Sequence, residues 1–144
     1  KLITDIDSLK SIIENEQKSG KCVVFTNGCF DIIHPGHIFI LEQAKLKGDI
    51  LVVGLNSDQS IKSFKSDHRP ICSQDDRAYV LAGLASVDYI FIFNDETPER
   101  IIMEISPDIL VKGGDYKIEN IVIFNPIMFF SKLIILRRGY IKVK

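Results

Sequence analysis

The sequence has no long apolar stretch, few cysteines and almost no net charge. No apolar run approaches the roughly 20 residues that a membrane-spanning helix needs, and residues 1–18 are polar and periodic, unlike a secretory signal. The three cysteines, Cys22, Cys29 and Cys72, show no paired spacing, so we expect reduced thiols in a cytoplasmic protein. A net charge of −1 gives no reason to expect nucleic acid or a membrane surface as a partner.

The length and apolar content of the chain suit a single α/β domain. With 144 residues, 46% of them hydrophobic, the chain can form a full sheet with helices on both faces. Helical and strand patterns alternate without a repeat or linker, which predicts one domain over residues 1–144 with a mostly parallel sheet. The expected strands are 22–26, 50–55, 89–93, 109–111 and 132–136. The expected helices are one capped by Ser8 and ending near Gly20, then 35–47, 59–64, one opened by a capping box at 73–76, and one that starts at Thr97–Glu99.

The segment from Gly28 to His37, with the sequence GCFDIIHPGH, is the most informative part of the chain. It follows an expected buried strand and leads into an apolar face at helical spacing. Helix N-termini attract anions because their first N–H groups are unpaired and the helix dipole is positive there. His34 and His37 are about one helical turn apart, so both can face the same bound group. The segment therefore predicts a phosphate-binding site, and a nucleotide site in particular.

Each of the first four expected strands ends in polar residues. In open parallel sheets, ligands bind beyond the carboxyl ends of the strands, where the strand order reverses. Four polar strand ends at one edge fit that rule, whereas one alone would mean little. The segments are Thr26-Asn27, Asn56-Ser57-Asp58, Asn94-Asp95 and Lys112-Gly113-Gly114-Asp115.

Three further features admit both a functional and a structural interpretation. The basic residues Lys62, Lys65, His68 and Arg69 could neutralise a triphosphate or form a solvated loop. Glycines 113 and 114 let backbone amides approach a base or ribose, but a Gly-Gly pair is also a routine turn. Arg77 lies in the first turn of its expected helix, where a cation opposes the helix dipole. An anionic ligand explains it, and so does an acidic partner such as Asp75 or Asp76.

The histidine pair also has alternatives. His34 could cap its helix while His37 packs in the core. Two histidines one turn apart can share zinc, with Cys29 nearby, but a structural zinc site needs four ligands and neither Cys22 nor Cys72 has suitable spacing. We expect no metal bound directly by side chains. Nucleotidyl transfer fits better, because it depends on positioning and on stabilising charge on phosphate oxygens, which imidazole N–H groups and helix-end amides supply.

The segment 28–37 matches the His-x-Gly-His signature of the cytidylyltransferase-like nucleotidyltransferases. Further matches make residues 5–122 resemble the heptose 1-phosphate adenylyltransferase domain of ADP-heptose synthesis, which occurs alone or fused to a kinase. These matches are Asn56-Ser57-Asp58, Arg69-Pro70, Asp76-Arg77, Val87-Asp88-Tyr89, Glu96-Thr97-Pro98 and the run from Pro107 to Tyr116.

The resemblance implies a Rossmann-like doubly wound sheet, a homodimer, and a reaction of ATP with a sugar 1-phosphate in the presence of Mg²⁺. It implies catalytic roles for His34, His37, Lys62 and Lys65. The implied nucleotide-binding residues are Thr26, Asn27, Gly28, Cys29, Phe30, Asp31, Gly36, Arg77, Lys112, Gly113, Gly114 and Asp115, and the implied substrate-binding residues are Asn56, Asp58 and Arg69.

The C-terminal part, from about residue 123, departs from the family. Relatives end in a Ser/Thr run that holds the triphosphate, whereas Gly139-Tyr140 is followed here by Ile141, Lys142, Val143 and Lys144. The stretch 121–130 is also unusually apolar. Two alternatives to the adenylyltransferase therefore stay open: a cytidylyltransferase of the glycerol 3-phosphate type, and a nucleotide-binding module with impaired catalysis.

Overall fold

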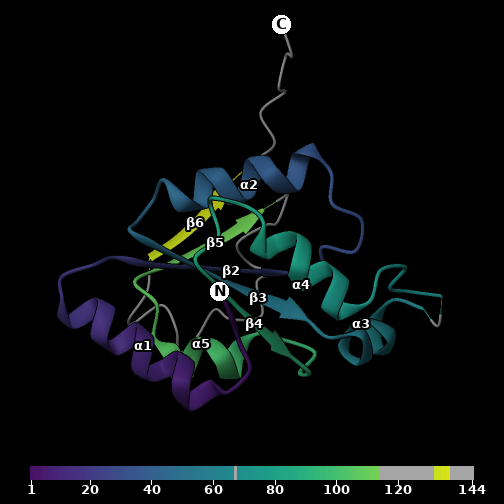
Figure 1. Ribbon diagram of the computed structural model, residues 1–144, viewed down its shortest axis with the longest axis horizontal. Helices are drawn as coiled ribbons and strands as arrows, with labels where there is room; N and C mark the ends of the chain where they lie inside the picture. Colours follow the sequence, from purple (N-terminus) through teal and green to yellow (C-terminus); the bar gives the residue numbers. More distant parts are fainter. Residues whose placement is uncertain (67, 114–131, 137–144) are drawn as a thin grey trace, which may run out of the picture.

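The computed structural model describes residues 1–66, 68–113 and 132–136 as one six-stranded sheet with helices on both faces (Figure 1). All neighbouring strands pair in parallel, in the order β1-β4-β3-β2-β5-β6. The predicted α/β class and doubly wound parallel sheet are confirmed. The strands are β1 Leu2–Ile3, β2 Val23–Gly28, β3 Ile50–Asn56, β4 Tyr89–Phe93, β5 Ile109–Gly113 and β6 Lys132–Leu136. The helices are α1 Ile6–Lys18, α2 Pro35–Lys45, α3 Asp58–Phe64, α4 Gln74–Ala82 and α5 Glu99–Ile105.

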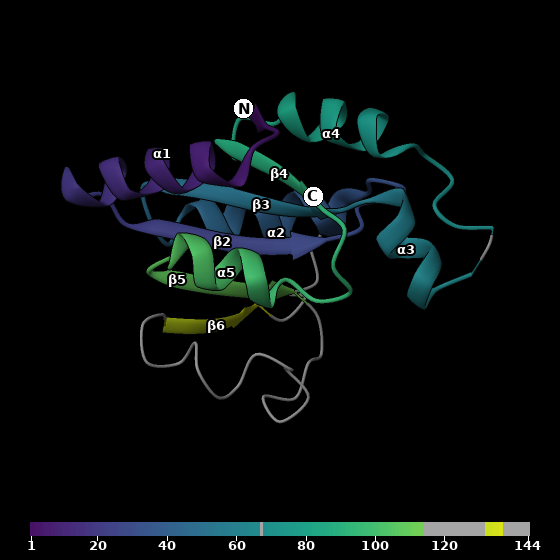
Figure 2. The same cartoon turned by 90° about the horizontal axis from the view of Figure 1, so that it is seen from below.

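The sheet separates two apolar cores, because successive side chains of a strand point to opposite faces. Val23 and Phe25 pack with α1 and α5 on one face, while Val24 packs with α2 and α4 on the other. Figure 2 shows α1 and α5 on one side of the strands, with α3 beyond the end of β3. Central strand β3 is buried along its whole length, as expected for a parallel strand covered on both faces.

The element boundaries differ from the sequence prediction mainly at helix starts. Helix α1 begins two residues before Ser8, and its cap is Asp5, whose carboxylate accepts the Ser8 N–H at 2.8 Å. Helix α5 begins after Pro98 without a side-chain cap, so Thr97 does not cap it. The predicted cap of α4 is confirmed, since Ser73 Oγ accepts the Asp76 N–H at 3.2 Å. The two-residue strand β1 was not predicted, because so short an edge strand carries no detectable period.

The two ends of the sheet differ in how their polar groups are used. At the amino end, an aspartate directly before a strand accepts a backbone N–H from the neighbouring strand in three places. Asp49 accepts from Cys22 at 2.8 Å, Asp88 from Leu51 at 2.7 Å and Asp108 from Val23 at 2.8 Å. The amino end is thus held together by internal hydrogen bonds, and the polar strand ends gather at the opposite edge.

None of the helices in the described ranges is both long enough and apolar enough to cross a membrane.

Candidate active site

A cavity of about 640 Å³ lies at the carboxyl edge of the sheet, where β2 adjoins β5. From β2 the chain continues through α2 to β3 on one side, whereas β5 lies on the other side, so this is the point where the strand order reverses. The cavity confirms that the polar strand ends converge. Its lining residues are Asn27, Gly28, Cys29, Phe30, Asp31, Ile32, His34, His37, Asn56, Phe64, Lys65, Arg69, Glu96, Lys112 and Gly113.

The two histidines stack on each other at the start of α2. Their ring centroids are 3.9 Å apart and the rings are inclined by 29°. His34 is the N-cap residue of α2, and its Nδ1 accepts the N–H of Gly36 at 3.1 Å. Because Nδ1 accepts, the neutral ring carries its proton on Nε2, which is thereby a donor. The capping role and the functional role are therefore compatible, since one nitrogen closes the helix and the other stays a donor in the cavity wall.

The Phe30 ring makes a tilted contact with the His37 ring. Its ring centroid lies 5.3 Å from that of His37, and the side chain is buried. Phe30 has a positive φ of 47°, which is uncommon for an aromatic residue and costs conformational energy. A Cβ on Gly28 would come within 3.0 Å of the Phe30 ring. Gly28 therefore leaves the room that the ring needs to pack against His37.

Asp31 fastens the segment after α3 to the loop before α2. Its Oδ2 accepts from Arg69 Nη1 at 2.7 Å, and its Oδ1 accepts the N–H groups of Ile71 at 2.7 Å and Cys72 at 2.9 Å. Desolvation raises the pKa of this carboxyl, but the hydrogen bonds from Cys72, Arg69 and Ile71 outweigh it, and the net pKa is lowered. Asp31 thus remains a carboxylate and holds Arg69 at the cavity wall.

Arg77 was predicted to bind nucleotide, but the structure gives it a different role. Its side chain is only 1% exposed, so its charge does not reach the cavity. The guanidinium donates to the carbonyls of Cys72 at 3.0 Å, Cys29 at 2.5 Å and Asn56 at 2.8 Å, and to Asp58 Oδ1 at 2.7 Å. The acidic partner is Asp58 rather than Asp75 or Asp76. Arg77 therefore positions the ends of β2 and β3, and Asp58 is its ion-pair partner.

Some of the other predicted residues lie away from the cavity. Thr26, Gly36 and Lys62 are not among its lining residues, since Thr26 is buried in β2 and Lys62 is exposed on α3. Predicted residues Gly114 and Asp115 lie outside the described residues, as does the atypical C-terminal part except for β6.

Sequence reasoning missed three lining residues, Ile32, Phe64 and Glu96. Glu96 could have been found, because it directly follows the polar end of β4. Ile32 and Phe64 are apolar residues in or beside loops, and no signal in the sequence marks them.

Neither a cysteine nucleophile nor a side-chain metal site is supported at the cavity. Burial raises the pKa of Cys29, and the smaller effects of Lys65 and Arg77 do not reverse it, so the group stays a thiol. Among the described residues, no group of three His, Cys, Asp or Glu side chains is placed to hold a metal ion.

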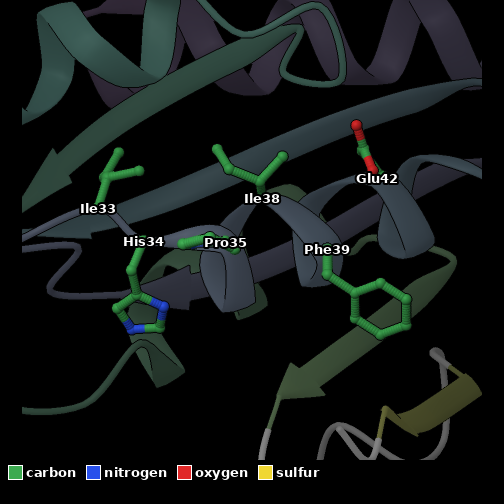
Figure 3. A pocket seen from close by; sticks show the side chains of 6 residues that line it. All are labelled: Ile33, His34, Pro35, Ile38, Phe39 and Glu42. Atoms are coloured by element: carbon green, nitrogen blue, oxygen red, sulfur yellow. The ribbon is translucent and has the colours of Figure 1, made fainter. Parts of the chain in front are cut away.

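A second cavity, of about 470 Å³, shares His34 with the first and has a different chemical character. Figure 3 shows its lining side chains distributed along the loop before α2 and the first turns of that helix, with Glu42 at the far end. Apart from His34 and Glu42 its described lining residues are apolar, and no lysine or arginine is among them. A phosphate site therefore belongs to the first cavity and not to this one.

Comparison with known proteins identifies the family of the chain. Residues 25–138 match the family model described as Cytidylyltransferase-like, which spans the cavity from β2 onward. The chain belongs to the cytidylyltransferase-like family. The nucleotidyltransferase assignment made from the segment 28–37 is thereby confirmed at the level of the family.

Curated relatives match the chain at about half of the aligned positions. The chain is 53% identical over 120 residues to the bifunctional protein HldE of Nitratiruptor sp., covering 83% of this chain and 26% of that protein. The HldE of Campylobacter concisus is 58% identical over 118 residues, which cover 79% of this chain and 25% of that protein. The HldE of Helicobacter pylori is 49% identical over 132 residues, which cover 92% of this chain and 28% of that protein. The chain thus spans about a quarter of the length of these relatives.

Solved structures agree with the fold. A lipopolysaccharide core biosynthesis protein from Thermoplasma volcanium superposes with a TM-score of 0.68 at 28% identity, covering 83% of this chain and 98% of that one. A pantothenate synthetase from Thermus thermophilus superposes with a TM-score of 0.67 at 13% identity, covering 96% of this chain and 62% of the other. The second likeness supports the fold alone.

Proposed function

We propose that this chain is an adenylyltransferase domain that transfers AMP from ATP to a heptose 1-phosphate and releases pyrophosphate. A phosphate oxygen of the sugar attacks the α-phosphorus of ATP, the bond between that phosphorus and the β-phosphate oxygen breaks, and ADP-heptose forms. The product is of the kind that lipopolysaccharide synthesis consumes. The proposal rests on the stacked histidines at the start of α2, in a cavity that cations also line, and on the close resemblance to HldE proteins.

The histidines supply hydrogen-bond donors where charge develops. In phosphoryl and nucleotidyl transfer the protein contributes mainly positioning and stabilisation of the equatorial phosphate oxygens. His34 is fixed by its cap to Gly36 and offers Nε2–H. The His37 ring stacks on the His34 ring and makes a tilted contact with the Phe30 ring. Donors that are oriented before the substrate arrives lose little energy to reorganisation, which is why they lower the barrier.

The cations of the wall favour a polyphosphate. Lys65 and Arg69 from the loop after α3 and Lys112 from β5 line the same cavity. Asn56 and Glu96 also line it, and their oxygens suit the hydroxyl groups of a sugar. The cavity thus combines donors for phosphate with acceptors for a polyhydroxylated acceptor substrate.

We expect Mg²⁺ to arrive with ATP. The Asp31 carboxylate is already occupied by three donors, so the described side chains fit a cation held mainly by phosphate oxygens and water. When bound, that cation neutralises phosphate charge. A homodimer, implied by the resemblance, and a cytoplasmic location, expected from the cysteines, remain predictions.

The test is pyrophosphate release with Mg²⁺, using ATP or CTP as donor and heptose 1-phosphate or glycerol 3-phosphate as acceptor. We expect release with ATP and the heptose only. If pyrophosphate is released with CTP instead, the transfer mechanism stands but the proposed nucleotide donor is wrong. ATP binding without release under any condition would favour the binding module, for which the lack of a Ser/Thr run after Tyr140 is the motivating observation.

A further inference from the structure

Three cations line the cavity, and they differ in how their charge is balanced. Arg69 is paired with Asp31 at 2.7 Å. Lys65 is exposed to solvent, which screens its charge. Lys112 is largely buried on β5, and no ion pair between it and another described residue is present. The described partner of its Nζ is the neutral side-chain oxygen of Asn27 on β2.

A largely buried ammonium whose partner among the described residues is neutral is costly in free energy. An amide oxygen satisfies one of the three donors of the lysine but does not replace the lost hydration of the charge. Accordingly, desolvation lowers the pKa of Lys112 from 10.5 to about 8. Groups perturbed in this way by burial in a cavity are enriched at functional sites.

Lys112 is held at this position by close packing behind it. A Cβ on the next residue, Gly113, would come within 2.6 Å of Ile40 Cδ1. The end of β5 therefore lies directly against α2, the helix that begins at the histidines. Because β2 and β5 are neighbouring strands, the contact between Lys112 and Asn27 joins the two strands between which the strand order reverses.

We propose that Lys112 binds a phosphate group at the junction of β2 and β5, and that it exchanges its bond to Asn27 for phosphate oxygens when the ligand enters. This inference rests on the proposed function and narrows it, because the resemblance places the segment from Lys112 beside the nucleoside. An adenine or ribose carries no charge and cannot balance a buried ammonium. A phosphate group brings at least one negative charge and several acceptors to the same place.

The experiment is a series of binding measurements by calorimetry on the full chain and on Lys112→Met. The ligands are adenosine, AMP, ADP and ATP, the matching cytidine series, heptose 1-phosphate and inorganic phosphate. Hydrogen bonds to charged groups contribute about 1.5–3 kcal/mol, so we expect phosphate-bearing ligands to bind about 10–100 times more weakly to the variant. Adenosine should bind within about twofold of wild type.

Two control variants make the comparison specific. Lys112→Arg keeps the charge and should retain most of the affinity for phosphate. Lys47→Met makes the same chemical change at an exposed position just after α2. Its affinity for every ligand should equal that of wild type. Thermal unfolding of each variant reports whether the fold is intact.

The pattern across the series decides between the possible phosphates. If Lys112→Met binds AMP, ADP and ATP more weakly than wild type does, Lys112 contacts the α-phosphate. If only ADP and ATP bind more weakly, it contacts the β-phosphate. If only heptose 1-phosphate and inorganic phosphate bind more weakly, it contacts the phosphate of the acceptor. Equal weakening of adenosine and ATP, or unchanged binding throughout, would overturn the inference. If wild type binds cytidine nucleotides but not ATP, the adenylyl donor is wrong and Lys112 is judged on the cytidine series. If wild type binds no phosphate ligand, both proposals fail.

Discussion

The two ends of the sheet use charged residues in opposite ways. Its amino edge is formed by the first residues of the parallel strands, and its carboxyl edge by their last residues. At the amino edge, Asp49, Asp88 and Asp108 accept backbone N–H groups of the neighbouring strands, so their charge serves the fold. At the carboxyl edge, Lys112 is buried against the neutral Asn27 side chain, and the histidines stack in a cavity wall. The charged groups of the amino edge are hydrogen-bonded within the protein. The carboxyl edge presents hydrogen-bond donors and positive charge at a cavity where a ligand can bind.

The difference indicates that the amino edge contributes to stability and the carboxyl edge to function. Substitutions at the amino edge should change the free energy of unfolding without changing turnover. Substitutions of cavity residues at the carboxyl edge should change turnover or ligand binding, and at His34 and Lys112 they should change the free energy of unfolding as well. Arg77 is the exception at the carboxyl edge, because it is buried and donates four hydrogen bonds within the protein.

We expect the largest effect on stability from Arg77→Met. The change leaves the Asp58 carboxylate and three backbone carbonyls without their donor. Breaking a buried charge pair by removing one partner costs about 3–5 kcal/mol. Urea unfolding at an unchanged m value measures the loss. Arg77→Lys keeps the charge but loses the fork of donors, so its loss should be intermediate. A loss below about 1 kcal/mol for Arg77→Met would show that the guanidinium does not hold the strand ends.

His37→Ala should lower turnover by about 100-fold to 1000-fold, because losing one preorganised donor costs roughly 3–4 kcal/mol in the barrier. The unfolding free energy should change little by comparison. Turnover within a few-fold of wild type would remove His37 from the catalytic residues.

His34 allows its two roles to be separated by two substitutions. His34→Asn removes the imidazole and keeps a good N-cap, whereas His34→Ala removes both. Both variants should lose turnover, and His34→Ala should in addition be less stable by about 1 kcal/mol. Equal stability of the two variants would contradict a capping role for His34 Nδ1.

Lys112→Met should make the ligand-free protein more stable. A pKa of about 8 in the folded state against 10.5 in the unfolded state corresponds to about 3 kcal/mol at most, so we expect a gain of about 1–3 kcal/mol. Between those two pH values the unfolded wild type binds more protons, and wild-type stability therefore rises with pH. The advantage of the variant should be complete below pH 8 and disappear towards pH 10.5. A constant difference across that window would mean that Lys112 is not destabilised by burial.

Asp108→Ala tests the amino edge and should have the smallest effect on turnover. It removes the acceptor of the Val23 N–H and of the Gln17 side chain, at a cost of about 1–3 kcal/mol. Turnover should stay within about twofold of wild type. Asp108→Asn keeps an acceptor and should be close to wild type in both measurements. A loss of turnover without a loss of stability would mean that the two edges are not separate in function.

The sequence predicted the carboxyl edge better than the amino edge. Apolar periodicity and the polar residues between the elements located five of the six strands, and the segment 28–37 located the histidines, because both signals lie within a short stretch of sequence. The partners of Arg77 and Asp31 could not be predicted, since each bridges segments far apart in the chain. The three aspartates at the amino edge were missed for the same reason: their acceptor role depends on strand pairing.

The most direct test of the central claim is a nuclear magnetic resonance titration of the labelled chain with a non-hydrolysable ATP analogue and Mg²⁺. We expect backbone amide shifts in residues 27–37 and at Lys112 and Gly113. The chemical shifts of the backbone amides that donate to Asp49, Asp88 and Asp108 should not change. Shifts concentrated at the amino edge, or no shifts at a saturating concentration of the analogue, would contradict a nucleotide site at the junction of β2 and β5.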